Sequence, residues 1–297
     1  MSDIKESHEE RTAHAPREAV RLTVEVQQFR PGQWVDTFCP GITKAGGFTI
    51  TSTPTKATSA SPNRYIELSV KVSPENPVAA WLWQDERDIL GQFLQVRVGG
   101  SFIFPPPKAP PSFVKDPSAR VVFIAGGVGI NPLVSMVAFL GELNMAGHVA
   151  GEAGDSGCEV IFLYSVRAGK HQVQEDAGED GDKSVDVAQI PFLQRLTALY
   201  KSKAIRGHLK LFVTGGSRSY MDLPYNRGNV SFTRRRITTT DLDAAILDGD
   251  SGGGRKLEQT FVYICGVPTM TDAFIQHLTG KEGPRLAAHA VLCEKWW

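Results

Sequence analysis

The chain has 297 residues, and its 32 Lys and Arg balance 32 Asp and Glu, so the formal net charge at pH 7 is zero. This length is sufficient for two domains. Because the charge is balanced, no overall field favours nucleic acid or an acidic membrane, and we expect no nucleic-acid partner.

The four cysteines, Cys39, Cys158, Cys265 and Cys293, are widely separated and form no CxxC pair. This spacing argues against a zinc site, a disulfide framework and an iron–sulfur cluster, so we expect no metal; it suits a reducing compartment. No apolar run approaches the roughly 20 residues that cross a bilayer, so we expect no membrane span.

Residues 1–16 are polar and charged, and we expect them to be disordered. They match neither a signal peptide nor an Arg-rich, acid-poor transit peptide. The sequence as it stands therefore predicts a cytoplasmic protein, whereas a missing true N-terminus could have carried a mitochondrial targeting sequence.

Residues 17–112 are predicted to form an antiparallel β-barrel. Alternating apolar residues over 20–26 indicate a first strand, and a helix is expected over 78–84. The other predicted strands, separated by Gly- and Pro-containing turns, cover residues 34–38, 47–52, 65–72 and 93–98. Short strands between turns are typical of a small barrel.

Residues 118–297 are predicted to form a separate domain, after a stiff proline-rich linker over 105–117. Strands are expected at 121–124, 160–164, 209–213 and 261–265, and helices from Pro132 and over 192–200, 240–247 and 269–278. This alternation predicts a parallel, Rossmann-like sheet with helices on both faces.

Two turns in this domain follow apolar strands and precede helices: AGGVGINP over residues 125–132 and CGVPTM over 265–270. Glycines remove Cβ atoms that would hold a phosphate away from the backbone, and a helix start offers free N–H groups to a pyrophosphate. A lone turn of this kind also serves tight packing, so the pair of turns is what favours a dinucleotide site. The predicted cradle comprises Gly126, Gly127, Val128, Gly129, Asn131 and Pro132.

Six separated motifs carry a family resemblance: PGQWVD, GGF, RVGG, IAGGVGINPL, YICG and a terminal EKWW. From about residue 20 onward the chain resembles the ferredoxin-NADP reductase superfamily of flavin-dependent oxidoreductases, and within it the group called oxidoreductase NAD-binding domain-containing protein 1. The resemblance implies an FR-type flavin-binding barrel, followed by a NAD(P)-binding domain. Since the superfamily's barrel has six strands, the barrel here could lack its first strand.

On the flavin side, the resemblance implies FAD or FMN along the segment Phe48, Thr49, Ile50, Thr51 and Ser52. The superfamily has Arg, any residue, Tyr, Ser here. Gly46 replaces the Arg, Phe48 replaces the Tyr, and Thr49 keeps the hydroxyl. Losing the Arg removes a strong charge-assisted contact to phosphate.

A second departure lies at the following helix, where Ala80 replaces a small hydroxyl residue that caps the flavin phosphate in the superfamily. Lys71 or Arg64 is a candidate for a replacement charge. Each is at least as well explained as a solvated surface residue.

On the nicotinamide side, the resemblance implies NAD(H) or NADP(H), with the sulfur of Cys265 beside the nicotinamide ring. Gly266, Pro268 and Met270 would shape the corner beneath the ribose. The alternative for Cys265 is a small buried thiol in the core. Arg167 and Arg218 are candidates for a 2′-phosphate, although the family likeness favours NAD.

The C-terminal residues complete the implied site. Trp297 or Trp296 would stack on the flavin, and Glu294 would lie near the reacting rings. The alternative is that the two tryptophans staple the domains together.

The implied reaction is direct hydride transfer from nicotinamide to flavin, in which the protein positions the rings. Thr49, Cys265 and Glu294 are the implied catalytic residues, and the electron acceptor is expected to be a separate molecule. The alternative is a non-catalytic NAD(P)-binding or interaction protein that has lost flavin binding, which Gly46 and Ala80 favour.

Overall fold

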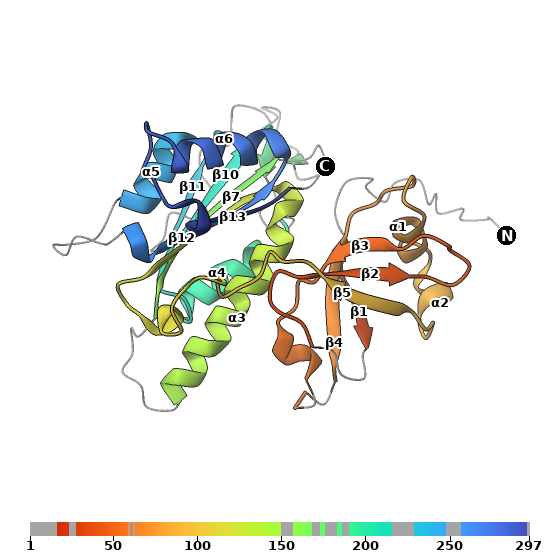
Figure 1. Cartoon of the computed structure of the whole chain (residues 1–297). Helices are drawn as coiled ribbons and strands as arrows, with labels where there is room; N and C mark the ends of the chain where they lie inside the picture. The colour runs from red at the N-terminus through yellow and green to blue at the C-terminus, as the bar shows by residue number, and fades with distance from the viewer. Residues whose placement is uncertain are drawn as a thin grey trace.

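The computed structural model describes residues 17–23, 28–58, 60–61, 63–149, 157–167, 173–175, 183–185, 190–215, 229–247 and 257–295. Antiparallel strands form its N-terminal part, and a parallel sheet with helices forms its C-terminal part (Figure 1). The fold class predicted from the sequence is thereby confirmed.

The N-terminal part consists of two antiparallel sheets in the residues described. Its strands are β1 (Arg17–Thr23), β2 (Trp34–Phe38), β3 (Gly46–Thr49), β4 (Tyr65–Val70) and β5 (Gln95–Gly99). β2 pairs with β3 and β5, β1 pairs with β4, and an Ile50–Leu68 bridge connects the two sheets. Two short helices, α1 (Pro77–Leu82) and α2 (Glu86–Ile89), precede β5.

The C-terminal part is built on a six-stranded parallel sheet in the order β11-β10-β7-β6-β12-β13. Its strands are β6 (Arg120–Gly126), β7 (Glu159–Arg167), β10 (Gly207–Thr214), β11 (Val230–Thr233), β12 (Thr260–Gly266) and β13 (Val291–Lys295). Every residue of β12 is buried, as expected for an interior strand covered on both faces. A separate hairpin pairs β8 (Val173–Glu175) with β9 (Lys183–Val185).

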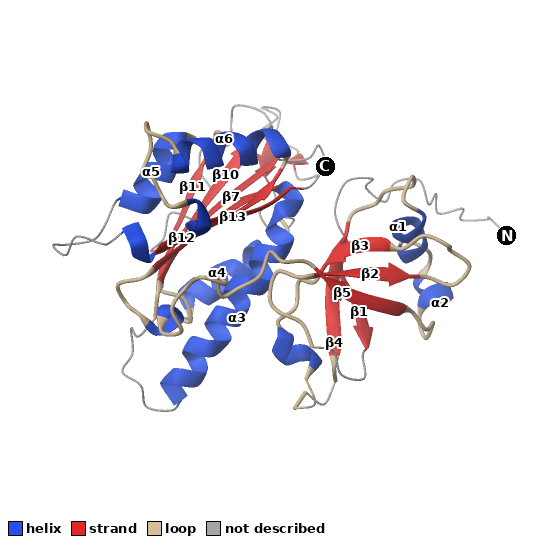
Figure 2. Cartoon of the chain, in the orientation of Figure 1, coloured by secondary structure: helices blue, strands red, loops and turns tan. Residues whose placement is uncertain are grey.

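Among the described residues, four helices cover the two faces of this sheet (Figure 2). They are α3 (Ile130–Val149), α4 (Leu193–Lys201), α5 (Thr239–Leu247) and α6 (Pro268–Thr279). In β6, Val121 and Phe123 join the core cluster beneath α3 and α4, whereas Val122 and Ile124 join the cluster beneath α5 and α6. Residues 127–147 are long and apolar enough for a membrane span by length and composition, but 61% of this apolar stretch is buried inside the protein. We therefore assign α3 as a core helix.

The structure differs from the sequence prediction at several elements. α3 begins at Ile130, before Pro132, because a proline is tolerated in the first turn, where its missing N–H has no helical partner. A 3-10 turn over Gly127–Gly129 precedes the helix. β8, β9, β11 and β13 were not predicted. β11 and β13 are short edge strands of the sheet, and such strands lack a long apolar run.

Helix α3 holds the two parts together through polar contacts. The Ser135 hydroxyl donates to the Ser52 carbonyl oxygen at 2.7 Å. The Glu142 carboxylate accepts hydrogen bonds from Thr53 at 2.9 Å and Thr55 at 2.6 Å. These contacts fix the N-terminal part against α3.

Helix α4 adds an ion pair across the same junction. Arg195 donates to the Glu67 carboxylate at 2.7 Å and to the Thr51 carbonyl oxygen at 3.2 Å. The Glu67 side chain is 1% exposed and also accepts a hydrogen bond from the Thr51 hydroxyl. A buried carboxylate of the barrel therefore depends on a cation from the other part.

Candidate functional site

The carboxyl ends of β6 and β12 form a topological switch point. The chain leaves β6 through α3 and enters β7 on one side, whereas β12 pairs with β6 on the other side. The strand connections therefore diverge at Gly126 and Gly266, the last residues of β6 and β12. Ligands of open parallel sheets bind in the crevice at such a point.

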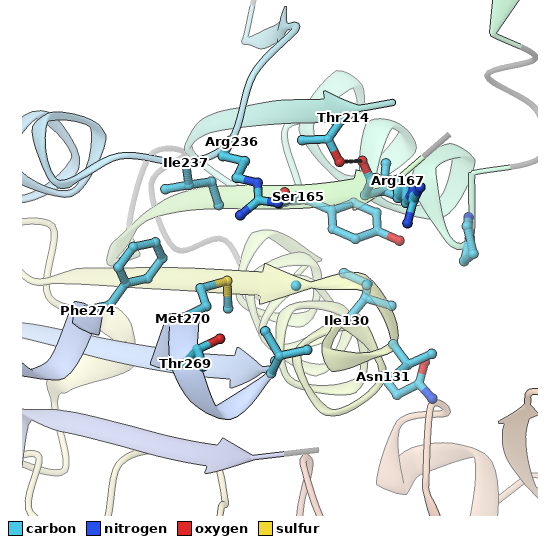
Figure 3. Close-up of a pocket in the computed structure, with 18 of the residues that line it drawn as sticks. Ile130, Asn131, Ser165, Arg167, Thr214, Arg236, Ile237, Thr269, Met270 and Phe274 are labelled. Atoms are coloured by element: carbon cyan, nitrogen blue, oxygen red, sulfur yellow. Dashed lines mark hydrogen bonds between the residues drawn. The ribbon is translucent and has the colours of Figure 1, made fainter. Parts of the chain in front are cut away.

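A cavity of about 850 Å³ lies at this crevice. The ends of β6, β7, β10 and β12, the first turns of α3 and α6, and Ser69 and Lys71 of the N-terminal part line it. Figure 3 shows Arg236 and Met270 directed into it from opposite walls. Three cations, Lys71, Arg167 and Arg236, line the cavity, and none of its described lining residues is acidic. The cavity therefore suits an anionic ligand.

Two glycines of the first turn have different tasks. Gly127 has a φ of 54°, and a Cβ built on it would meet no atom within 4 Å. Its missing side chain leaves the backbone open to a ligand. A Cβ on Gly129 would instead overlap the carbonyl group of Cys265, so Gly129 allows the first turn to pack on β12.

The second turn is closed by Met270. Its methyl carbon would lie 2.9 Å from a Cβ on Gly126 and 2.5 Å from a Cβ on Gly266. The thioether therefore fills the corner between the two strand ends. Pro268 is the first residue of α6, whose start faces the cavity through Thr269 and Met270.

Two polar atoms that line the cavity are buried without a hydrogen-bond partner in the structure: Asn131 Oδ1 and the Tyr164 hydroxyl. Asn131 Nδ2 donates to the Ser69 carbonyl oxygen at 3.3 Å, which leaves Oδ1 as an acceptor for another group. Burial raises the pKa of Tyr164, so its hydroxyl remains protonated. Unpaired buried polar atoms are costly, and a polar ligand would satisfy both.

Cys265, Glu294 and Ala125 are neighbours in register across three strands. Cys265 is fully buried in the core cluster beneath α3. Neither it nor Glu294 is among the described residues that line the cavity, and the same is true of Gly129, Pro132 and Pro268. Trp296 and Trp297 lie outside the described residues, as does Arg218.

Gly46, which stands where the superfamily has an Arg beside the predicted flavin segment, is the first residue of β3. A Cβ on Gly46 would lie 2.7 Å from the Phe48 ring and 2.7 Å from Cβ of Val78. Two apolar side chains therefore occupy the space that a longer side chain at position 46 would need.

The helix start that could hold a flavin phosphate is α1. Its N-cap Asn76 accepts hydrogen bonds from the backbone N–H groups of Val78 at 3.1 Å and Ala79 at 3.2 Å. Pro77 has no N–H, and Ala80 N donates to the Asn76 carbonyl oxygen. The residues present thus do not fit the phosphate of a flavin at this helix.

The remaining residues of the segment predicted to bind the flavin lie either in the core of the N-terminal part or in the hydrogen bonds around Glu67. Phe48 is half-buried and packs against the barrel core, in which Ile50 is fully buried, and Thr49 is 4% exposed. The Thr51 hydroxyl donates to Glu67, and the Ser52 hydroxyl accepts from Glu67 N, so both hydroxyls hold the residue that pairs with Arg195. Lys71, a candidate for the flavin phosphate, lines the cavity at the switch point.

Sequence reasoning missed Ser69, Tyr164 and Arg236 as residues of this site. Tyr164 follows an apolar run and reads as core, and Ser69 belongs to the other part of the chain. Arg236 follows β11, an edge strand that was not predicted. No local pattern marks these three, because only the sheet order brings them to one cavity.

No protein-family model matches the chain. It is similar to proteins named oxidoreductase NAD-binding domain-containing protein 1. The relative from Bos taurus is 32% identical over 271 residues, which are 91% of this chain and 72% of the relative. The relative from Danio rerio is 40% identical over 285 residues, which are 93% of this chain and 86% of the relative.

Two solved structures share the fold at low sequence identity. A flavohemoglobin from Malassezia yamatoensis, described with bound FAD and heme, has a TM-score of 0.57 at 16% identity, covering 96% of this chain and 59% of that one. A ferredoxin reductase in carbazole 1,9a-dioxygenase has a TM-score of 0.55 at 17% identity, covering 94% and 64%. This chain thus spans less than two thirds of either solved chain. Together with the identity to the named relatives, these matches show that the chain belongs to the oxidoreductase NAD-binding domain-containing protein 1 family and has the fold of ferredoxin-NADP reductase-type flavoproteins.

Proposed function

We propose that the protein is an NAD(P)H-dependent oxidoreductase that transfers a hydride from the nicotinamide to a flavin, and that electrons then pass to a separate acceptor. The observation that carries this proposal is the cavity at the switch point, which Ser69 and Lys71 from the N-terminal part help to line. A nucleotide in this cavity would contact both parts of the protein.

The residues present fit a pyridine dinucleotide. Gly127 gives the pyrophosphate access to the backbone, and the start of α3 contributes a partial positive charge. Asn131 Oδ1 would accept a hydrogen bond from a ligand N–H or O–H, because Ser69 already binds its amide nitrogen. Family membership supports NAD(P) as the ligand.

A flavin, if bound beside the nicotinamide, would supply the hydride-accepting chemistry. The protein's contribution would be orientation and the exclusion of water. Thr49, Cys265 and Glu294 remain the proposed residues near the reacting rings. Cys265 would act there by shaping the end of β12, since its side chain is buried.

The self-capped α1 and the closed space at Gly46 favour a second candidate, a non-catalytic nucleotide-binding protein. Both functions keep the nucleotide cavity. They differ in whether bound NAD(P)H delivers its hydride to a flavin.

The test is anaerobic mixing of the purified protein with NADH or NADPH and added FMN or FAD. The proposed oxidoreductase would bleach the flavin absorbance faster than the buffer does. A protein that binds the dinucleotide, but leaves the rate of bleaching unchanged, would support the non-catalytic candidate. Asn131→Ala is the matched variant, and it should lose most of the rate.

A further inference from the structure

The first turn of α1 has no N–H group left for a phosphate. Val78 and Ala79 donate to the Asn76 side chain, and Ala80 donates to the Asn76 carbonyl oxygen at 2.9 Å. Pro77, at the first helical position, lacks an N–H. A phosphate could bind here only by displacing Asn76, which already satisfies the N–H groups that a helix leaves free.

The start of β3 has no room for a cationic side chain. Val78 is 1% exposed, and both its Cβ and its Cγ1 would lie within 2.9 Å of a Cβ on Gly46. Phe48 closes the same space from its own strand. The second residue of α1 thus packs directly on β3, so that an apolar contact stands where two phosphate-binding elements would face each other.

Several other cations of the N-terminal part already have partners. Arg97 pairs with Asp36, Arg87 with Asp85, and Arg21 with Glu67. Lys71 lines the nucleotide cavity, where a pyrophosphate of the dinucleotide would use it. Three of these four cations thus already have a carboxylate partner, and the fourth lines the cavity.

From this arrangement we infer that the protein recognises a flavin by its isoalloxazine ring and not by its phosphate. Riboflavin, FMN and FAD would then be dissociable co-substrates of similar affinity, reduced by NAD(P)H and released, instead of one tightly held prosthetic group. This inference rests on the proposed function and narrows its substrate to the ring system common to the three flavins.

The experiment compares riboflavin, FMN and FAD by quenching of flavin fluorescence, with the full chain and no dinucleotide. We expect three dissociation constants within about threefold of one another, on the order of micromolar or weaker, because the ring alone carries the affinity. The purified protein should carry no stoichiometric flavin. A phosphate that is held by charge-assisted hydrogen bonds would instead separate FMN from riboflavin by roughly tenfold or more, and that result would overturn the inference.

A variant of Asn76 tests whether the capped start of α1 is the reason why the flavin phosphate adds no affinity. Asn76→Gly keeps a residue tolerated at an N-cap but releases the N–H groups of Val78 and Ala79. The affinity for FMN should then rise by at least about threefold relative to the affinity for riboflavin. Asp85→Gly is the matched control, because Asp85 caps α2 through Arg87 N and the change leaves α1 intact. If the ratio of the FMN affinity to the riboflavin affinity is unchanged in Asn76→Gly, the flavin lies away from α1 and the argument from this helix is overturned.

The same titration separates this inference from the proposed function. Strong selection for FMN or FAD refutes ring-only recognition while leaving flavin reduction in place. If none of the three flavins binds or is reduced, although NADH binds, the proposed function fails and the inference fails with it.

Discussion

Gly129 packs directly on the backbone of Cys265, and this contact joins the two turns of the nucleotide cavity. A Cβ at position 129 would overlap the Cys265 carbonyl group and lie 2.8 Å from Gly266 N. Since backbone atoms cannot move aside as a flexible side chain can, even Ala should force the two strand ends apart. The glycine is required here for contact between protein segments.

Gly129→Ala should therefore lower stability as well as nucleotide binding. We expect a loss of about 2 kcal/mol or more in the free energy of unfolding, because overpacking at a rigid contact is costly. Chemical denaturation measures this loss. A variant with unchanged stability would contradict the packing role.

Gly127→Ala should behave differently, because a Cβ there would meet open space. Its φ of 54° makes Ala cost about 1 kcal/mol. The dissociation constant for NADH or NADPH should rise even though the stability loss is modest, because position 127 lines the cavity and the added Cβ would take up space there. Calorimetric titration of both glycine variants separates the packing glycine from the binding glycine.

The Arg195–Glu67 pair should stabilise the junction between the two parts. Arg195→Met leaves the Glu67 carboxylate, 1% exposed, with the Thr51 hydroxyl and with Arg21 at 3.5 Å. We expect a loss of about 2 kcal/mol, below the range for fully buried pairs because Arg195 is partly exposed. Arg87→Met, which breaks an exposed pair, is the control and should cost under about 1 kcal/mol. Equal losses of stability in Arg195→Met and Arg87→Met would refute the proposal that the Arg195–Glu67 pair stabilises the junction.

Asp241 should make the stability depend on pH in the acid range. Burial raises the pKa of Asp241, but hydrogen bonds from Arg235, Lys210 and Thr238 outweigh it and hold the pKa well below its usual value. A depressed pKa in the folded state means that the stabilisation is present above the unfolded pKa of about 4 and is lost as the pH falls below it.

Asp241→Asn should thus be less stable than the wild type at pH 7, and the difference should narrow between about pH 4 and pH 2. Urea denaturation at a series of pH values measures both midpoints. A difference that stays constant across this range would show that the charge of Asp241 is not what stabilises the fold.

The sequence predicted the interior of the sheet well and its edges poorly. β6 and β12 are continuous apolar runs between turn residues, so their positions follow from local pattern. β11 and β13 depend on pairing with a neighbouring strand, which no short segment encodes.

The candidate site was predictable to the same extent. The glycine turn that contains Gly127 is a local motif, and it does line the cavity. That Gly46 stands where the resemblance implies an Arg could also be read from the sequence. The apolar contact of Val78 with Gly46, and the orphaned hydroxyl of Tyr164, depend on distant segments and became visible only in the fold.

Tyr164 offers the sharpest test of the nucleotide cavity. Its hydroxyl is buried without a hydrogen-bond partner, so Tyr164→Phe should leave the stability of the free protein unchanged or raise it by about 1 kcal/mol. If the hydroxyl binds the dinucleotide, the rise in Tm that NADH or NADPH produces should shrink in the variant.

Tyr200→Phe is the matched control, because the Tyr200 hydroxyl donates to the Val160 carbonyl oxygen at 3.3 Å within the core. That variant should lose about 1 kcal/mol of stability and keep the full rise in Tm on adding nucleotide. In the same thermal-unfolding assay, we therefore expect the Tyr164 variant to lose only the nucleotide effect on Tm and the Tyr200 variant to lose only stability. If Tyr164→Phe instead lowers the stability of the free protein and keeps the full rise in Tm on adding nucleotide, the Tyr164 hydroxyl belongs to the core. Asn131 Oδ1 would then be the remaining buried acceptor without a partner among the described cavity residues.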